Sequence, residues 1–282
     1  MPPEQLSELG KYGADKVLIY DQEILNLFSA ETYAKVLSHA AQNEKADLLV
    51  ISNTYSGKSV GPRVAAQLKA GMVSGVISFP DLSSGFKVRR TVFSGKAFAL
   101  VSIHTPIKVL AVTPNSFAVK ELPKTASLVQ ADAGLSAGDH LTKSLEVARA
   151  KGKIVLTEAE LVVSGGRGMK GPENWHLIEE LATILGAATA CSKPVSDMDW
   201  RPHTEHVGQT GITIKPNLYI AIGISGAIQH LAGVNSSKVI VAINKDPEAP
   251  LFKAADYGIV GDAFEVLPNI IEAAKIFKSQ QA

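Results

Sequence analysis

Runs of consecutive apolar residues alternate along the chain with stretches in which apolar side chains recur every three or four positions. Near the start, a helical pattern ends at Gly13 and is followed by a short apolar strand at 16–20. A second helix is predicted over 30–42, and the next run, 48–51, is apolar at every position, as in a strand covered on both faces. Strands that alternate with helices predict a parallel sheet covered by helices.

The pattern changes between 85 and 113. Apolar residues at 92–93 and 97–103 flank the sequence Ser-Gly-Lys, which predicts a β-hairpin, and 107–112 is a further strand. These features fit an antiparallel edge on a mostly parallel sheet. The following segment, 114–153, is more polar and has no clear period, and we predict the connection between two domains there.

The alternation of strands and helices returns after this connection. Four strands are predicted in the second half, at 161–163, 218–222, 239–243 and 258–260. A helix is predicted to begin near Pro172, bury an apolar face that includes Trp175, and end at Gly186. The predicted fold class is α/β, with two domains of mostly parallel, helix-covered sheets. The predicted domains are an N-terminal α/β domain at 1–148 and a C-terminal domain at 149–282.

Composition narrows the possible classes of protein. The chain has 282 residues, is 46% hydrophobic and 20% charged, and carries a net charge of +1 without long charged blocks. Such a chain can bury a core and does not resemble a nucleic-acid binder held by phosphate neutralisation. It has one cysteine, no apolar run long enough to span a membrane, and a start that resembles neither a signal peptide nor a transit peptide. We therefore expect a soluble intracellular protein without membrane insertion.

The residues that follow the four predicted strands of the second half are unlike ordinary loops. They are Gly165-Gly166-Arg167-Gly168, Gly223-Ile224-Ser225-Gly226, Asn244-Lys245-Asp246-Pro247 and Gly261-Asp262. The carboxyl ends of parallel strands lie at one sheet edge, where ligands of α/β proteins bind. Glycine lets backbone N–H groups approach phosphate oxygens, and Arg167 offers a bidentate partner. Glycines can simply end strands, but four such loops at one edge favour a nucleotide site.

The segment Gly166–Gly171 also matches the G-x-G-x-x-G pattern of dinucleotide-binding proteins, after a strand and before a helix. That pattern is typically followed, about 20 residues later, by an acidic residue that binds the ribose of NAD. Here Cys191 occupies that position, followed by Ser192 and Lys193. Because lysine suits the 2′-phosphate of NADP, an NADP-dependent oxidoreductase is the alternative hypothesis. A nucleotide-binding scaffold without a redox role is a third.

Other candidate chemistry is weaker. His203, Glu205 and His206 are close enough in sequence to suggest a metal site, but no further ligand is evident, so we interpret them as a solvated or partner-facing segment. Cys191 is interpreted as a packing residue because no activating base can be assigned to it. We therefore predict neither a metal site nor a catalytic residue.

The most distinctive stretch is 216–230, Pro-Asn-Leu-Tyr-Ile-Ala-Ile-Gly-Ile-Ser-Gly-Ala-Ile-Gln-His, which is continued by Val241–Asp246 and Ala255–Gly258. With the loop Val207–Gly211, this sequence resembles the α subunit of the electron-transfer flavoproteins. The resemblance is dense over the second half of the chain and looser around 53–73. It implies that FAD binds to the C-terminal domain, which is expected to be Rossmann-like.

The resemblance also assigns residues to the cofactor: Arg167, Ser192, Lys193, Val207, Gly208, Gln209, Thr210, Ser225, Gly226, Ala227, Ile228, Gln229, His230, Asn244, Asp262 and Ala263. Arg167 would face the flavin ring or the nearby phosphates, with 192–193 beside it. The segments 207–210 and 225–230 would wrap the ring and the pyrophosphate. Asn244 and the pair at 262–263 would hold the adenosine end.

Physical chemistry makes these residue types sensible. Hydroxyl donors such as Thr210 or Ser225 near the ring tune its electron-rich states, and a cation or a protonated His230 favours an anionic reduced flavin.

Two departures from the family are visible. The family usually has arginine in place of Lys193, which would alter the flavin potential because lysine lacks the planar fork. The family also opens with a strand and a helix that are not found here, so either the sequence is truncated or the N-terminal domain lacks them.

The function implied by the resemblance is that of an electron carrier, not an enzyme. It would take electrons from flavin dehydrogenases, such as the acyl-CoA dehydrogenases of fatty-acid oxidation, and pass them to a quinone-linked or other flavoprotein acceptor. Its partner would be the β subunit of a heterodimer, in the cytoplasm of a bacterial cell. Whether the complex also divides electrons with NADH depends on the partner's own cofactor.

Overall fold

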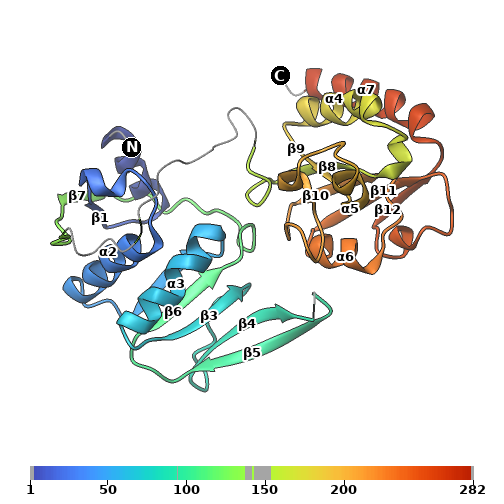
Figure 1. The fold of residues 1–282 in the computed structure, drawn as a ribbon. Helices are drawn as coiled ribbons and strands as arrows, with labels where there is room; N and C mark the ends of the chain where they lie inside the picture. Colours follow the sequence, from blue (N-terminus) through green and yellow to red (C-terminus); the bar gives the residue numbers. More distant parts are fainter. Residues whose placement is uncertain (1–2, 94, 137–141, 143–153, 281–282) are drawn as a thin grey trace. The chain divides into compact units, whose positions relative to one another are not determined.

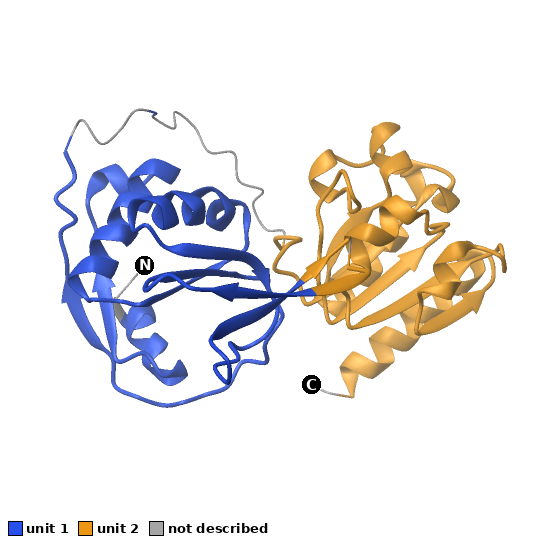
Figure 2. Ribbon diagram, turned by 90° about the horizontal axis from the view of Figure 1, so that it is seen from below, with its two compact units in different colours: residues 1–90, 99–149 blue, residues 91–98, 150–282 orange. Residues whose placement is uncertain are grey.

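The computed structural model describes residues 3–93, 95–136, 142 and 154–280. The chain folds into two compact units, one formed by 1–90 and 99–149 and the other by 91–98 and 150–282 (Figures 1 and 2). The predicted domain boundary, between 148 and 149, lies outside the described residues. Within the described part, no helix is long and apolar enough to cross a membrane.

The first unit is built on a five-stranded sheet. In spatial order its strands are β2 (Leu48–Ser52), β6 (Lys108–Val112), β3 (Gly71–Val76), β4 (Phe86–Val92) and β5 (Ala97–Ile103). The first three are parallel, and β4 pairs antiparallel with β3 through Val76 and Arg90. The predicted antiparallel edge on a mostly parallel sheet is confirmed.

Two helices, α2 (Ala30–Asn43) and α3 (Tyr55–Gln67), pack side by side against this sheet (Figure 1). Their buried residues, such as Ala34 and Val64, meet Val109 of β6 in one apolar cluster. The prediction that β2 is covered on both faces is wrong. β2 lies at the sheet edge, and Val50 is 60% exposed.

A short two-stranded sheet completes the first unit. The initial helix α1 (Pro3–Ser7) continues as the 3₁₀-helix η1 (Glu8–Tyr12), which Gly13 ends with a φ of +95°. The strand β1 (Lys16–Ile19) then pairs in parallel with β7 (Ser127–Gln130). β7 lies inside the segment predicted to be an irregular connection, so that prediction was wrong at its centre. β7 has four residues and all are exposed, so it has no buried face that would produce an alternation of apolar and polar residues.

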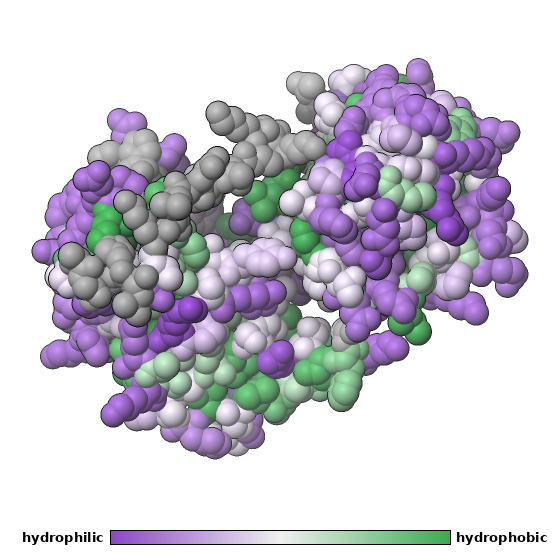
Figure 3. Space-filling model, in the orientation of Figure 1, coloured by the Kyte–Doolittle hydropathy of each residue, from purple (hydrophilic) through white to green (hydrophobic). Residues whose placement is uncertain are grey.

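Exposed apolar side chains gather over β4 and β5 (Figure 3). Phe98 and Leu100 on β5 are 61% and 62% exposed, and Phe79 before β4 is 79% exposed. An apolar surface of this kind is typical of a protein–protein contact.

The second unit contains a five-stranded, fully parallel sheet. In spatial order its strands are β9 (Ala188–Cys191), β8 (Leu161–Gly165), β10 (Leu218–Ile222), β11 (Val239–Asn244) and β12 (Tyr257–Val260). In this doubly wound order the direction of winding reverses between β8 and β10, and crevices for ligands form at such a switch point. The four predicted strands are confirmed. β9 was missed because its four residues are mostly small.

Helices cover both faces of this sheet (Figure 1). α4 (His176–Leu185) and α7 (Ala263–Ser279) lie on one face, and α6 (Ile228–Val234) lies on the other. Pro172 begins a 3₁₀ turn, η5 (Pro172–Trp175), which leads into α4, and Gly186 ends α4 with a φ of +67°. The predicted helix is therefore confirmed, with its first turn wound more tightly.

The shorter elements are η4 (Arg167–Met169), α5 (Lys193–Asp197), η6 (His203–Glu205) and η7 (Pro250–Lys253), with η2 (Glu23–Leu25) in the first unit.

Candidate functional site

The site begins where the loops after β8 and β10 interlock. Gly166 N donates to the carbonyl of Ile222 at 2.8 Å, and Gly168 N donates to the carbonyl of Gly223 at 3.0 Å. A Cβ atom on Gly166 would lie 2.2 Å from the Gly223 oxygen, a distance at which the backbones would have to move apart. Glycine is therefore required for this contact, which forms the floor of the switch point.

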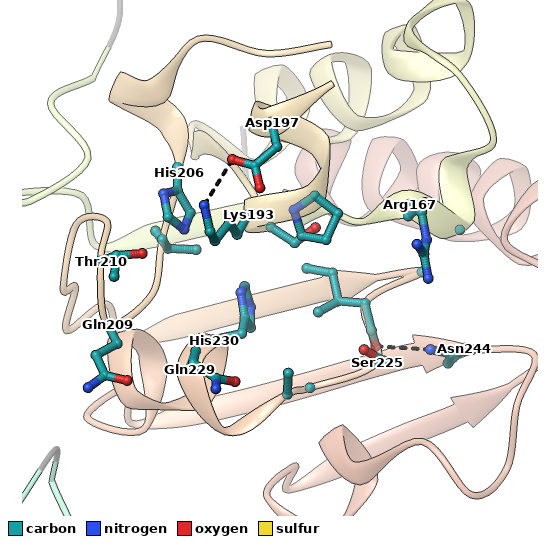
Figure 4. Close-up of a pocket in the computed structure, with 18 of the residues that line it drawn as sticks. Arg167, Lys193, Asp197, His206, Gln209, Thr210, Ser225, Gln229, His230 and Asn244 are labelled. Atoms are coloured by element: carbon teal, nitrogen blue, oxygen red, sulfur yellow. Dashed lines mark hydrogen bonds and ion pairs between the residues drawn. The ribbon is translucent and has the colours of Figure 1, made fainter. Parts of the chain in front are cut away.

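A hollow of about 520 Å³ opens above this floor (Figure 4). It is lined by Arg167, Gly168, Ser192, Lys193, Pro194, Asp197, His206, Val207, Gln209, Thr210, Gly223, Ile224, Ser225, Gly226, Ala227, Gln229, His230, Asn244 and Asp246. A second hollow of about 260 Å³ includes Asp262 and Ala263 and shares Arg167 and Asn244 with the first. The two hollows therefore meet at the ends of β8 and β11.

Twelve of the sixteen predicted cofactor residues line the larger hollow, and two more, Asp262 and Ala263, line the smaller one. Gly208 and Ile228 line neither. Ile228 is the first residue of α6 and is 64% exposed, whereas Gly208 packs against the backbone of that helix. The structure thus brings the predicted residues together, and their contact with a cofactor stays a prediction.

The two cations of the hollow differ in their surroundings. Arg167 is exposed, and its guanidinium forms no hydrogen bond or ion pair with another described residue. Lys193, the first residue of α5, forms an ion pair with Asp197 at 3.0 Å, and both side chains are about half exposed. Arg167 is therefore the cation that is available to an anionic ligand.

The glycine-rich segment does not present a phosphate-binding backbone as expected. The N–H groups of Gly166 and Gly168 are bonded to the β10 loop, and that of Gly171 donates to the Met169 carbonyl at 2.9 Å. The first α-helical residue is His176, so no α-helix N-terminus follows the glycines directly. The expectation that these glycines bring N–H groups to phosphate is wrong, because the N–H groups of Gly166, Gly168 and Gly171 already have backbone carbonyl partners.

Asn244 holds the loop that carries Ser225. Its Nδ2 donates to the carbonyl of Ile224 at 2.9 Å, while its Oδ1 accepts from the N–H of Asp246 at 3.0 Å. The carbonyl of Ser225 accepts from Leu251 N at 3.0 Å. These bonds fix the loop and leave the exposed Ser225 side chain at the hollow (Figure 4).

His230 forms the buried wall of the hollow. The residue is 7% exposed, and its Nε2 lies 2.8 Å from the hydroxyl of Tyr219. Removal from water lowers the pKa of His230 to about 4, because burial disfavours the charged imidazolium. Burial therefore favours a neutral His230 at pH 7 over the protonated form considered from the sequence.

His206 is a lining residue that the sequence did not identify. The segment around it was interpreted as solvated or partner-facing. His203 is exposed, but the interpretation is wrong for Glu205 and His206, which are 6% and 5% exposed. Glu205 is buried because Arg201 donates two hydrogen bonds to it, both at 2.8 Å. Burial, followed by the charge of Lys193, lowers the pKa of His206. The one available signal was its position directly before the predicted loop at 207–211.

Comparison with known proteins shows two matching family models. Residues 155–235 match the electron transfer flavoprotein FAD-binding domain, and residues 3–135 match the electron transfer flavoprotein domain. The electron transfer flavoprotein subunit alpha of Bacillus subtilis (strain 168) is 42% identical over 271 residues, which are 95% of this chain and 83% of that protein. The chain belongs to the electron transfer flavoprotein alpha subunit family.

Other relatives of this alpha subunit chain have similar coverage. The electron transfer flavoprotein subunit alpha of Pseudomonas aeruginosa is 40% identical, over 93% of this chain and 83% of the relative. The acryloyl-CoA reductase electron transfer subunit beta of Anaerotignum propionicum is 34% identical, over 96% and 83%. The names of these proteins describe electron transfer.

The hollow of this alpha subunit chain fits FAD by its chemistry. Arg167, whose guanidinium has no partner among the described residues, offers a cation to an anionic ligand, and Ser225 offers a hydroxyl. His230 Nδ1 is a buried polar atom without a hydrogen-bond partner in the described part of the chain. A ligand rich in acceptors and carrying phosphate satisfies all three groups. FAD is the cofactor of this domain.

At the smaller hollow of the alpha subunit chain, Asp262 caps α7 by accepting from Phe264 N at 2.9 Å, which lowers the pKa of its carboxyl. It also pairs with Lys170 at 3.3 Å.

Cys191 is fully buried on β9, and burial raises the pKa of its thiol to about 12, so it is a packing residue as predicted.

Proposed function

We propose that this chain holds FAD within an electron carrier that accepts electrons from flavin dehydrogenases, such as acyl-CoA dehydrogenases, and delivers them to a quinone-linked or other flavoprotein acceptor. The observation that carries the proposal is the gathering of fourteen of the sixteen predicted residues around two adjoining hollows at a switch point. The name of the Anaerotignum propionicum relative, which joins electron transfer to a CoA-ester reductase, supports a donor or acceptor of this class.

The residues that line the hollow have different roles in this proposal. Arg167 binds an anionic group of the cofactor, and the interlocked loops at Gly166 and Gly223 keep the floor rigid. His230 and Val207 form a buried wall that excludes water. Ser225 and Thr210 donate hydrogen bonds to the cofactor and so influence its potential. When bound, FAD supplies the reversible uptake and release of electrons.

The sixteen sequence-assigned residues are proposed as the FAD contacts, with two qualifications from the structure. Ile228 acts only by beginning α6, and Gly208 acts by packing against Gly233 of that helix. Asp197 and His206 are added, since both line the larger hollow.

A β subunit is the proposed partner, and 1–148 and 149–282 are the proposed domains. The exposed apolar side chains over β4 and β5, including Phe98 and Leu100, support such a partner because water-exposed surfaces of this kind are usually covered in an assembly. We place the heterodimer in the bacterial cytoplasm.

The NADP-dependent alternative finds less support. Its pattern requires free backbone N–H groups at Gly166 and Gly168, and both are bonded within the protein. Its lysine for the 2′-phosphate, Lys193, is already paired with Asp197.

The test is co-expression of this chain with its β subunit, followed by an absorption spectrum and a reductive titration. We expect a yellow complex whose FAD is reduced by an acyl-CoA dehydrogenase with its substrate and reoxidised by an electron acceptor. A colourless protein that binds NADPH would support the alternative. A bound nucleotide that takes up no electrons would support a scaffold and contradict the carrier.

A further inference from the structure

Tyr219 is a polar residue of the C-terminal core that no part of the proposed function uses. It lies on β10, is fully buried, and packs in an apolar cluster with Ala190, Ala221 and Val234. Its hydroxyl is 2.8 Å from Nε2 of His230, and the two ring centroids are 6.0 Å apart. A hydroxyl in apolar surroundings is costly unless it is hydrogen-bonded, so this bond is strongly favoured.

The second nitrogen of His230 has different surroundings. Nδ1 is buried and has no hydrogen-bond partner in the described residues, and His230 lines the hollow (Figure 4). A neutral imidazole carries one N–H and one acceptor nitrogen, and the bond at one nitrogen decides the state of the other.

The backbone around His230 is closely packed. Gly233 of α6 packs so closely on the next loop that a Cβ atom there would lie 2.4 Å from Gly208 N. Gln209 N donates to the Gln229 carbonyl at 2.7 Å and closes the loop over the helix. Tyr219 is equally fixed, because β10 is paired on both sides, with β8 and β11.

Two arrangements of the protons satisfy the contact between Tyr219 and His230. If Nε2 carried the proton, the Tyr219 hydroxyl would accept it, and its own O–H would have no acceptor in hydrogen-bond geometry among the described residues. If the Tyr219 hydroxyl donates to Nε2, its O–H is satisfied and the imidazole proton resides on Nδ1. The second arrangement is favoured.

We propose that Tyr219 is a positioning residue: its hydroxyl donates to Nε2 of His230 and so keeps the imidazole proton on Nδ1, as a hydrogen-bond donor for the bound flavin. This inference rests on the proposed function, because it requires FAD in the larger hollow. Tyr219 does not line the hollow and acts only through His230. A neutral donor here stabilises the electron-rich cofactor without the cost of burying a charge.

The variant Tyr219→Phe removes the hydroxyl and keeps the ring. A matched control is Tyr33→Phe in the first unit, where a tyrosine hydroxyl donates to the Leu25 carbonyl at 2.9 Å, remote in sequence from the FAD-binding domain. His230→Gln provides the assignment of the His230 signals and the background for a double variant.

The direct readout is the ¹⁵N chemical shift of His230 in the heterodimer labelled with ¹⁵N-histidine at pH 7, with and without FAD. We expect a protonated Nδ1 and an unprotonated Nε2 in the native protein, and loss of this preference in Tyr219→Phe. A protonated Nε2 in the native protein would overturn the proposal. The FAD-free sample decides this point even if the electron-carrier function fails, so the two failures are distinguishable. If Tyr219→Phe does not assemble, the native spectrum alone decides.

The second readout is the flavin. We expect Tyr219→Phe to lower the midpoint potential and to weaken FAD binding by about fivefold, the effect of losing one hydrogen bond. Tyr33→Phe should change neither. In the His230→Gln background, Tyr219→Phe should have no further effect on the potential. An equal effect in both backgrounds would show that Tyr219 does not act through His230 and would overturn the proposal.

Discussion

The two ends of the larger hollow bind a polar ligand in different ways. At one end Arg167 is exposed and carries a charge without a partner in the described residues. At the other end His230 is 7% exposed, neutral and bonded to a tyrosine hydroxyl. Charge is used where water reaches the site, and neutral hydrogen bonds where water is excluded, because an unpaired buried charge is very costly. We infer that the exposed end retains the cofactor and the buried end adjusts its potential.

Both ends depend on the same floor, and removing it should have the largest effect. In Gly166→Ala the new methyl group would lie 2.2 Å from the Gly223 carbonyl oxygen. We expect a loss of about 3 kcal/mol in the free energy of unfolding, together with loss of FAD, measured by urea denaturation and flavin absorbance of the complex. Gly186→Ala is the control. Its new methyl group would have no described atom within 4 Å, so the only expected cost comes from the positive φ at this position. Equal losses in the two variants would show that the loops need no close contact.

The buried end predicts a dependence of stability on pH. The pKa of His230 is about 4 in the folded chain and about 6.5 when unfolded. Between these values the unfolded chain binds a proton that the folded chain does not, so stability is complete above pH 6.5 and falls as the pH drops toward 4. Over this window the native protein should lose up to about 3 kcal/mol more than His230→Gln. Parallel pH profiles from chemical denaturation would mean that His230 is not buried as described.

The exposed end predicts a difference between its two cations. Arg167→Ala should weaken FAD binding by about 2 kcal/mol, because a bidentate, charge-assisted contact is lost. Lys193→Ala should cost well under 1 kcal/mol, since its ammonium is exposed and shared with Asp197. Dialysis followed by flavin absorbance measures both, and equal loss of FAD would contradict the distinction.

The smallest effect is expected at Ser225, between the two ends. Its hydroxyl is exposed and forms no hydrogen bond in the described part of the chain, so Ser225→Ala should change unfolding by less than about 0.5 kcal/mol. The midpoint potential of the flavin should shift, and Ser225→Thr, which keeps a hydroxyl, should shift it less. An unchanged potential in Ser225→Ala would show that the hydroxyl does not reach the ring.

Much of the second unit was predictable because its strands are buried on both faces and read as continuous apolar runs. β8, β10 and β11 are of this kind, and Gly186 marked the end of α4. The strands β7 and β9 were not predicted, since four exposed or small residues carry no period. The exposed face of β2 was not predicted either, because a position at the sheet edge is set by the tertiary fold.

The site was predictable in its residues but not in its contacts. The resemblance identified Arg167, Ser225 and His230, and the hollow contains all three. The bonding of Gly168 N to the Gly223 carbonyl joins segments far apart in the sequence. The burial of Glu205, next to His206, depends on its hydrogen bonds from Arg201, and the lowered pKa of His230 depends on its burial. Such contacts are properties of the assembled sheet edge.

The central claim is that FAD occupies the hollow at the ends of β8 and β10 and contacts both of its unlike ends. A crystal structure of the FAD-loaded heterodimer tests this most directly. The account predicts cofactor density between the loops at 166–168 and 223–230, with cofactor atoms within hydrogen-bond distance of the Arg167 guanidinium and of His230 Nδ1. Cofactor density elsewhere, with Arg167 and Nδ1 of His230 both left without a partner, would contradict it.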